Sequence, residues 1–130
     1  MQQGERYELA VARYFEAWNA VGEGELGKAV AAAFEEGAGY TDPLADVAGH
    51  EGLTALIAGA HGQFPGHEFR QVGDVDGHHD LVRFRWELVS AADGAAPVAG
   101  SDVARLGEDG RIRSVLGFLD RVPGTEAAAR

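Results

Sequence analysis

The chain has 130 residues, which suits a single domain. Its 21 acidic residues against 11 basic ones give a net charge of −10, which disfavours binding to nucleic acid and to anionic membranes. Because there is no cysteine, disulfides, thiolate metal sites and a cysteine nucleophile are excluded. The sequence shows neither a secretion signal nor an apolar run of membrane-spanning length, so we expect a cytoplasmic protein.

The first half of the chain is predicted to form three helices, because its apolar residues recur at intervals of three and four. The first helix runs through residues 7–18. The second carries Phe34 on its apolar face and ends near Gly37, and the third covers residues 51–64. Residues 39–43 lie between the last two helices and are predicted to form a short edge strand and turn.

The second half is predicted to form strands, because apolar and polar residues alternate and turn residues separate the segments. The expected strands cover residues 68–76, 81–90, 97–106 and 111–122, with a turn at residues 77–78 and no strand before residue 38. This order predicts one α+β domain over residues 5–122, with the helices packed on one face of a mainly antiparallel sheet. Residues 123–130 follow as a flexible tail.

Four segments carry a resemblance to known proteins: residues 12–16 (ARYFE), 40–43 (YTDP), 84–88 (FRWEL) and 101–106 (SDVARL) with the hairpin that follows. On these motifs the chain resembles ketosteroid isomerases and SnoaL-type cyclases of the nuclear-transport-factor-2-like (NTF2-like) superfamily. The resemblance implies a cone-shaped, cystatin-like fold, in which a curved sheet wraps around the first helix and leaves a pocket. Residues 19–20 and 117–120 are closer to the SnoaL-type branch.

The resemblance also implies catalytic roles for three residues. Asp42 matches the general base of the isomerases, Tyr14 the tyrosine that binds the developing oxyanion, and Asp102 the protonated aspartate beside it. Tyr14 and Asp42 are 28 residues apart, more than the isomerases lead us to expect, and Trp18 is the alternative occupant of the tyrosine position. Phe34 stands where the isomerases have a supporting tyrosine, so steroid isomerisation itself is not expected.

The residues themselves support these roles but leave alternatives open. Asp102 falls on the same face of its predicted strand as apolar neighbours, so it is expected to be buried. Burial would raise its pKa and leave it neutral, and a neutral aspartate can donate a hydrogen bond. It could instead cap a loop or pair with an arginine. Pro43 holds Asp42 extended, where it can act as a base or simply form a turn. Tyr14 lies on a helix face where most aromatic residues are core.

A small hydrophobic ligand that carries an oxygen would suit the predicted pocket. No metal is expected, because His50, His61 and His67 lack a ligating spacing, and the reaction would require no cofactor. The residues expected to bind the ligand are Trp18, Tyr40, Leu56, Ile57, His61, Phe64, Phe84, Trp86, Leu88 and Leu119.

Three functions are compatible with this pattern. The first is a cofactor-independent isomerase or cyclase that acts on a steroid- or polyketide-like carbonyl compound. The second is a non-catalytic binding protein, because this fold is widely reused. The third is an epoxide hydrolase of the limonene type, which requires an arginine between two aspartates, although Arg83 and Arg85 alternate away from Trp86. A homodimer is expected through the outer face of the sheet, at Val89, Val103 and Phe118.

Overall fold

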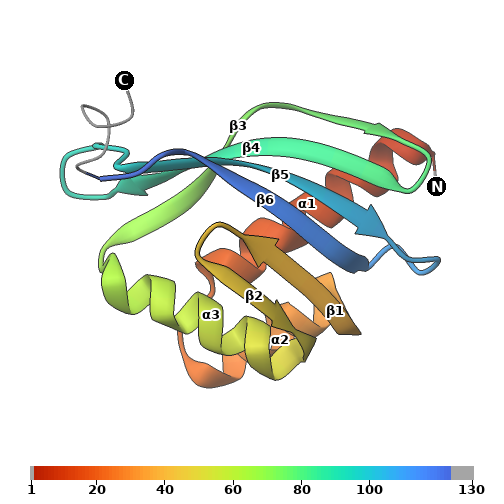
Figure 1. The fold of residues 1–130 in the computed structure, drawn as a ribbon, viewed down its shortest axis with the longest axis horizontal. Helices are drawn as coiled ribbons and strands as arrows, with labels where there is room; N and C mark the ends of the chain where they lie inside the picture. The colour runs from red at the N-terminus through yellow and green to blue at the C-terminus, as the bar shows by residue number, and fades with distance from the viewer. Residues whose placement is uncertain (1, 124–130) are drawn as a thin grey trace.

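The computed structural model describes residues 2–123, so the predicted tail lies outside the described residues except for Pro123. The helices are α1 (Gln3–Asn19), α2 (Glu23–Ala33) and α3 (Gly49–Gln63). The strands are β1 (Phe34–Asp42), β2 (Ala45–Ala48), β3 (His67–His78), β4 (Leu81–Ser90), β5 (Val98–Leu106) and β6 (Ile112–Arg121) (Figure 1). No helix within this part of the chain is long and apolar enough to cross a membrane.

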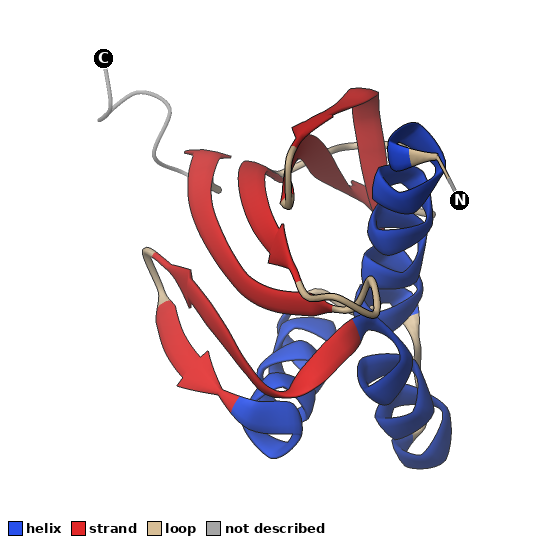
Figure 2. Ribbon diagram, turned by 90° about the vertical axis from the view of Figure 1, so that its right-hand side faces the viewer, coloured by secondary structure: helices blue, strands red, loops and turns tan. Residues whose placement is uncertain are grey.

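The strands form one six-stranded sheet in the order β2-β1-β6-β5-β4-β3. All neighbours are antiparallel except β1 and β6, which run parallel. The long strands are strongly curved, and the helices lie together on one side of them (Figure 2). Part of this curvature comes from β3, whose pairing with β4 shifts between Val72 and Asp76, where Gly73 has a φ of 72° that favours glycine. The predicted α+β architecture is confirmed.

The core lies between the three helices and the inward face of the sheet. The predicted apolar face of α1 is buried, apart from the partly buried Phe15, and so are the alternate residues of β4 from Val82 to Leu88. Asn19 fixes the end of α1 on β3, because its side chain accepts a hydrogen bond from the Phe69 N–H at 2.8 Å and donates to the Phe69 carbonyl at 2.9 Å. These contacts set the distance between the last turn of α1 and the sheet.

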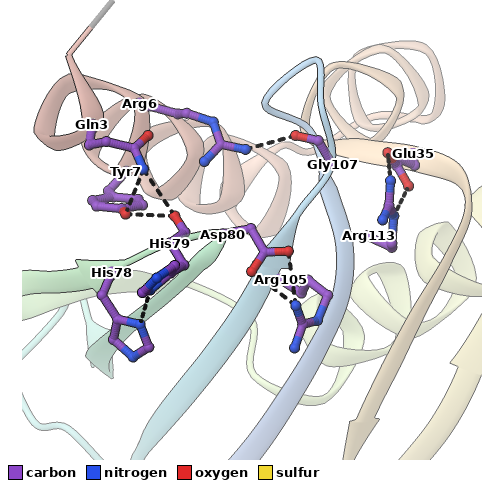
Figure 3. A network of polar contacts seen from close by, with 10 residues as sticks. All are labelled: Gln3, Arg6, Tyr7, Glu35, His78, His79, Asp80, Arg105, Gly107 and Arg113. Atoms are coloured by element: carbon purple, nitrogen blue, oxygen red, sulfur yellow. Dashed lines mark hydrogen bonds and ion pairs between the residues drawn. The ribbon is translucent and has the colours of Figure 1, made fainter.

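The other end of α1 is held by polar contacts (Figure 3). Arg6 donates to the Gly107 carbonyl at 2.9 Å, and the Tyr7 hydroxyl donates to the His79 carbonyl at 2.7 Å. Both carbonyls belong to loops between strands, so the start of the helix is tied to the loops at one end of the sheet. The position of α1 is therefore fixed at both ends.

The expectation of no strand before residue 38 is wrong, because β1 begins at Phe34. Phe34 ends the second helix rather than extending it: it is fully buried and pairs with Ile112 of β6. Arg111 donates to the carbonyls of Ala31 and Phe34, both at 3.3 Å, and so stabilises the junction where the helix stops.

Two further expectations about the strands are corrected. Residues 39–43 do not form an edge strand, since β1 lies inside the sheet between β2 and β6, and β2 itself was not anticipated. The turn predicted at residues 77–78 falls two residues later, at His79 and Asp80, because β3 remains paired with β4 as far as His78.

Candidate active site

A cavity of about 710 Å³ lies between the end of α1, helix α3 and the inner face of the sheet. This volume is within the range of small-molecule sites. Its polar side chains are those of Tyr14, Tyr40, Asp42 and Gln63, and most of the remaining wall is apolar. The apolar part includes Phe15, Trp18, Leu44, Leu56, Phe64, Phe69, Trp86, Leu88, Val98 and Leu119.

Asp102 is the buried acidic group beside this cavity. Its strand places it inward, as predicted, and only 2% of its surface is exposed. The Tyr14 hydroxyl donates to its Oδ2 at 2.6 Å. Burial raises the pKa of Asp102 to about 6, and the Tyr14 and Trp86 side chains oppose part of the rise. Asp102 is not part of the cavity wall and is connected to it through Tyr14.

Tyr14 links α1 to this carboxyl group. Its ring packs edge-to-face against Phe84, with centroids 4.9 Å apart, and against Phe34 at 5.9 Å. Burial and the charge of Asp102 raise the pKa of Tyr14 well above its ordinary value, so the hydroxyl keeps its proton at physiological pH. Tyr14, rather than Trp18, therefore occupies the position that contacts Asp102.

A second tyrosine–aspartate pair lies on β1. Tyr40 is two residues before Asp42, on the same face of the strand, and its hydroxyl donates to Asp42 Oδ2 at 2.6 Å. Asp42 Oδ1 accepts hydrogen bonds from the N–H groups of Leu44, at 2.8 Å, and Ala45, at 2.9 Å. Asp42 thus has the turn-forming role that the sequence left open as an alternative, and it also lines the cavity.

The two pairs meet at Gly117 of β6. A Cβ atom built on Gly117 would lie 2.6 Å from Asp102 Oδ1, too close for the carboxyl group to keep its place, and 3.4 Å from the Cβ of Asp42, an ordinary contact. The two carboxyl groups therefore lie on opposite sides of one small residue. Asp42 opens onto the cavity, and Asp102 lies behind Tyr14.

Seven of the predicted ligand-binding residues line the cavity, namely Trp18, Tyr40, Leu56, Phe64, Trp86, Leu88 and Leu119. Three do not. Ile57 is fully buried in the core, Phe84 packs behind Tyr14, and His61 is turned away, with its Nε2 donating to the Trp18 carbonyl at 2.6 Å.

Several cavity residues were missed by sequence reasoning, including Phe15, Leu44, Phe69 and Val98. Alternation along β3 and β5 places Phe69 and Val98 on the inward face and could have identified them. Leu44 gives no such signal, because it lies in the turn after Pro43. No arginine is found among the described residues of the wall, and Arg83 and Arg85 are exposed on the outer face of the sheet.

Residues 11–115 match the family model of the SnoaL-like domain. The chain belongs to the SnoaL-like family. A solved structure from Agrobacterium tumefaciens, described as a candidate isomerase of this family, is 37% identical, covers 89% of this chain and 98% of its own, and has a TM-score of 0.84. No curated protein matches the sequence at a significant level.

More distant structures confirm the predicted NTF2-like fold. A candidate SnoaL-like polyketide cyclase from Jannaschia sp. CCS1 is 21% identical, with a TM-score of 0.73 over 92% of this chain and 89% of its own. An NTF2-like protein of unknown function from Exiguobacterium sp. 255-15 is also 21% identical, with a TM-score of 0.66 over 85% of this chain and 98% of its own. At this identity the likeness of these two concerns the fold alone.

Proposed function

We propose that this SnoaL-like protein moves a proton next to the carbonyl group of a small, neutral, hydrophobic compound, as a cofactor-independent isomerase or cyclase. One observation carries the proposal: a cavity-lining carboxylate, Asp42, and a buried Tyr14–Asp102 pair lie at the same end of one apolar cavity. A base and an oxyanion donor on neighbouring sides of a ligand are what enolisation requires. The SnoaL-like relative described as a candidate isomerase is consistent with this chemistry.

In the proposed reaction Asp42 removes a proton from the carbon next to the carbonyl, and the electron pair of that C–H bond forms an enolate. Tyr14 donates its hydroxyl hydrogen bond to the enolate oxygen. It can do so when Asp102 is protonated and donates to the Tyr14 oxygen, a form that the raised pKa of Asp102 makes available below about pH 6. Asp42 then returns the proton to another carbon in an isomerisation, or the enolate carbon attacks a second carbonyl in a cyclisation.

The charges around the cavity indicate a neutral substrate. Neither lysine nor arginine is present among the described residues of the wall, whereas Asp42 lines it and Asp102 lies behind it. An anionic ligand would lose its hydration without gaining a cationic partner. We therefore propose ketones, rather than carboxylic acids or phosphates, as ligands.

A non-catalytic ligand-binding protein is the second candidate. Both oxygens of Asp42 already accept hydrogen bonds, one from Tyr40 and the other from two backbone N–H groups. This is also what a purely turn-forming aspartate would show. An epoxide hydrolase is not supported, because Arg83 and Arg85 lie outside the cavity.

The proposal includes a homodimer formed through the outer face of the sheet. Phe118 and Leu116 of β6 are 67% and 57% exposed there, and Val103 of β5 is 37% exposed. Large exposed apolar side chains in one area are typical of interfaces. Val89 does not belong to this patch, since it is buried, and Leu116 takes its place.

A cytoplasmic location stays a prediction from the sequence.

Exchange of the α-protons of β-tetralone in heavy water, followed by NMR, tests the proposed catalysis. The wild-type protein should accelerate exchange over buffer, and Asp42→Asn should reduce the enzymatic rate by about a hundredfold or more, because general-base catalysis contributes about that much. The matched control is Asp46→Asn, an exposed carboxylate that accepts a hydrogen bond from Thr41 in the same hairpin, and its rate should match wild type. Ketone binding without accelerated exchange would support the binding protein and refute the enzyme.

A further inference from the structure

The indole N–H of Trp18 is a buried donor without an acceptor. Trp18 is 6% exposed. Every other buried side-chain nitrogen or oxygen atom within residues 2–123 has a hydrogen-bond partner, but Trp18 Nε1 has none. Folded proteins rarely leave such a group unpaired, and an exception calls for an explanation such as a bound molecule. Trp18 also belongs to the wall of the cavity, where a bound molecule could supply the acceptor.

The ring of Trp18 is held in place, so the N–H does not find a partner by turning. Its centroid lies 6.1 Å from that of Tyr14, 5.6 Å from Tyr40 and 5.1 Å from Phe69. On the backbone of the same residue, the Trp18 carbonyl accepts the hydrogen bond from His61 at 2.6 Å. The indole is therefore packed between the two tyrosines of the candidate site.

The neighbouring donors are already used within the protein. The Tyr14 hydroxyl donates to Asp102, and the Tyr40 hydroxyl donates to Asp42. The Trp18 side chain lies near enough to the Tyr14 hydroxyl for a weak hydrogen-bond contribution that opposes part of the rise in the Tyr14 pKa, although no hydrogen bond of normal geometry joins them. It is thus an uncommitted donor at the end of the cavity where the reacting carbonyl is placed.

We propose that the Trp18 N–H donates a hydrogen bond to the carbonyl oxygen of a neutral ketone bound in this cavity. The inference rests on the cavity being the ligand site of the proposed function, but it does not require catalysis. An acceptor on the ligand would satisfy the orphaned donor, whereas a hydrocarbon of the same shape would leave it unpaired. Trp18 thereby selects ligands with an oxygen at this end.

NMR of the indole N–H groups tests the proposal directly. The chain has two tryptophans, so two indole signals are expected, and Trp18→Phe assigns them by removing one. On titration with β-tetralone the Trp18 signal should move downfield, and with tetralin, the matched hydrocarbon, it should not. Trp18→Phe should weaken binding of the ketone about fivefold, as expected for the loss of one hydrogen bond, and leave binding of the hydrocarbon unchanged.

Two controls separate the hydrogen bond from shape and from catalysis. Phe64→Leu changes the apolar wall alone and should weaken both ligands alike. Asp42→Asn should reduce the enzymatic exchange of β-tetralone about a hundredfold or more but keep the downfield shift, so the enzyme proposal and this inference can fail independently. Trp18→Phe removes an unpaired buried donor but also part of a buried ring, so urea unfolding checks that the variant is folded before its binding is compared.

Three results would overturn the inference. The first is an equal loss of ketone and hydrocarbon affinity in Trp18→Phe, which would mean that the indole only shapes the wall. The second is a Trp18 signal that does not respond to the bound ketone, which would leave Tyr14 as the partner of the N–H. The third is failure of every ketone in a size series around β-tetralone to bind at millimolar concentration.

Discussion

Replacing Asp102 by asparagine should remove a pH-dependent loss of stability. The pKa of Asp102 is about 6 in the folded protein against an ordinary value of 3.8, because burial disfavours its charged form. Below the ordinary value the carboxyl group is neutral in both the folded and unfolded states, and it contributes no pH dependence. Above about pH 6 it is ionised in both, and the folded state is destabilised by the cost of holding the buried charge.

The magnitude follows from the size of the shift. A difference of about two pKa units, at about 1.4 kcal/mol each, corresponds to about 3 kcal/mol of unfolding free energy. This stability should be lost as the pH rises from about 4 to about 7. Asparagine has nearly the same shape, accepts the Tyr14 hydrogen bond through its carbonyl oxygen and does not ionise.

Urea unfolding of both proteins across this pH range measures the effect. The unfolding free energy of Asp102→Asn minus that of wild type should increase by about 3 kcal/mol between about pH 4 and about pH 8. Asp80→Asn provides a control of opposite sign. A hydrogen bond from Arg105 lowers the pKa of Asp80, so that variant should lose stability relative to wild type as the pH rises.

If the difference in unfolding free energy between Asp102→Asn and wild type stayed constant or fell as the pH rises, burial would not disfavour the charged form of Asp102, and this reasoning would be refuted. Asp102→Leu supplies a second outcome, because it removes the buried polar group altogether. It should remain folded at neutral pH and lose exchange activity. Unfolding of Asp102→Leu would instead show that Asp102 is a structural hydrogen-bonding centre, and the oxyanion role would be abandoned.

Two further substitutions test the wall and the outer face. Gly100→Ala should destabilise the protein by about 1–3 kcal/mol in urea unfolding, because the added Cβ would lie 2.6 Å from Trp86 Cε2 and 2.8 Å from the Phe118 carbonyl oxygen. Unchanged stability would mean that Trp86 moves freely. Phe118→Glu should convert the proposed dimer to a monomer in sedimentation experiments while exchange per chain is retained. A monomeric wild-type protein would refute the dimer.

Short-range patterns predicted most of the fold and one part of the site. Alternation along residues 81–90 matches β4 at both ends, and the same alternation placed Asp102 inward among apolar neighbours. The face of α1 that carries Tyr14 follows from helical spacing alone. These features depend on neighbours in sequence, which is why a single sequence contains them.

Contacts between distant segments were not predictable in the same way. The parallel pairing of β1 with β6 depends on segments about 75 residues apart, and nothing near Phe34 signals that a strand begins there. The bond between Tyr14 and Asp102 joins residues 88 positions apart, and the sequence offered it only as a possibility through resemblance. By contrast, Tyr40 and Asp42 are two residues apart on one strand, so their pairing had a local signal that went unused.

The two carboxyl groups have similar positions but different surroundings, and this difference supports the roles proposed for them. Asp42 accepts three hydrogen bonds, from one hydroxyl and two N–H groups, a set of donors that suits a carboxylate. Asp102 accepts a hydrogen bond from the Tyr14 hydroxyl at 2.6 Å and is 2% exposed. The inward face of its strand carries no cation, and the nearby charge of Asp42 contributes to the rise in its pKa. Ionising both would place two negative charges on either side of Gly117. This difference supports the proposed reaction, in which Asp42 is the base and Asp102 lies behind Tyr14, so that Tyr14, rather than Asp102, would contact the substrate oxygen.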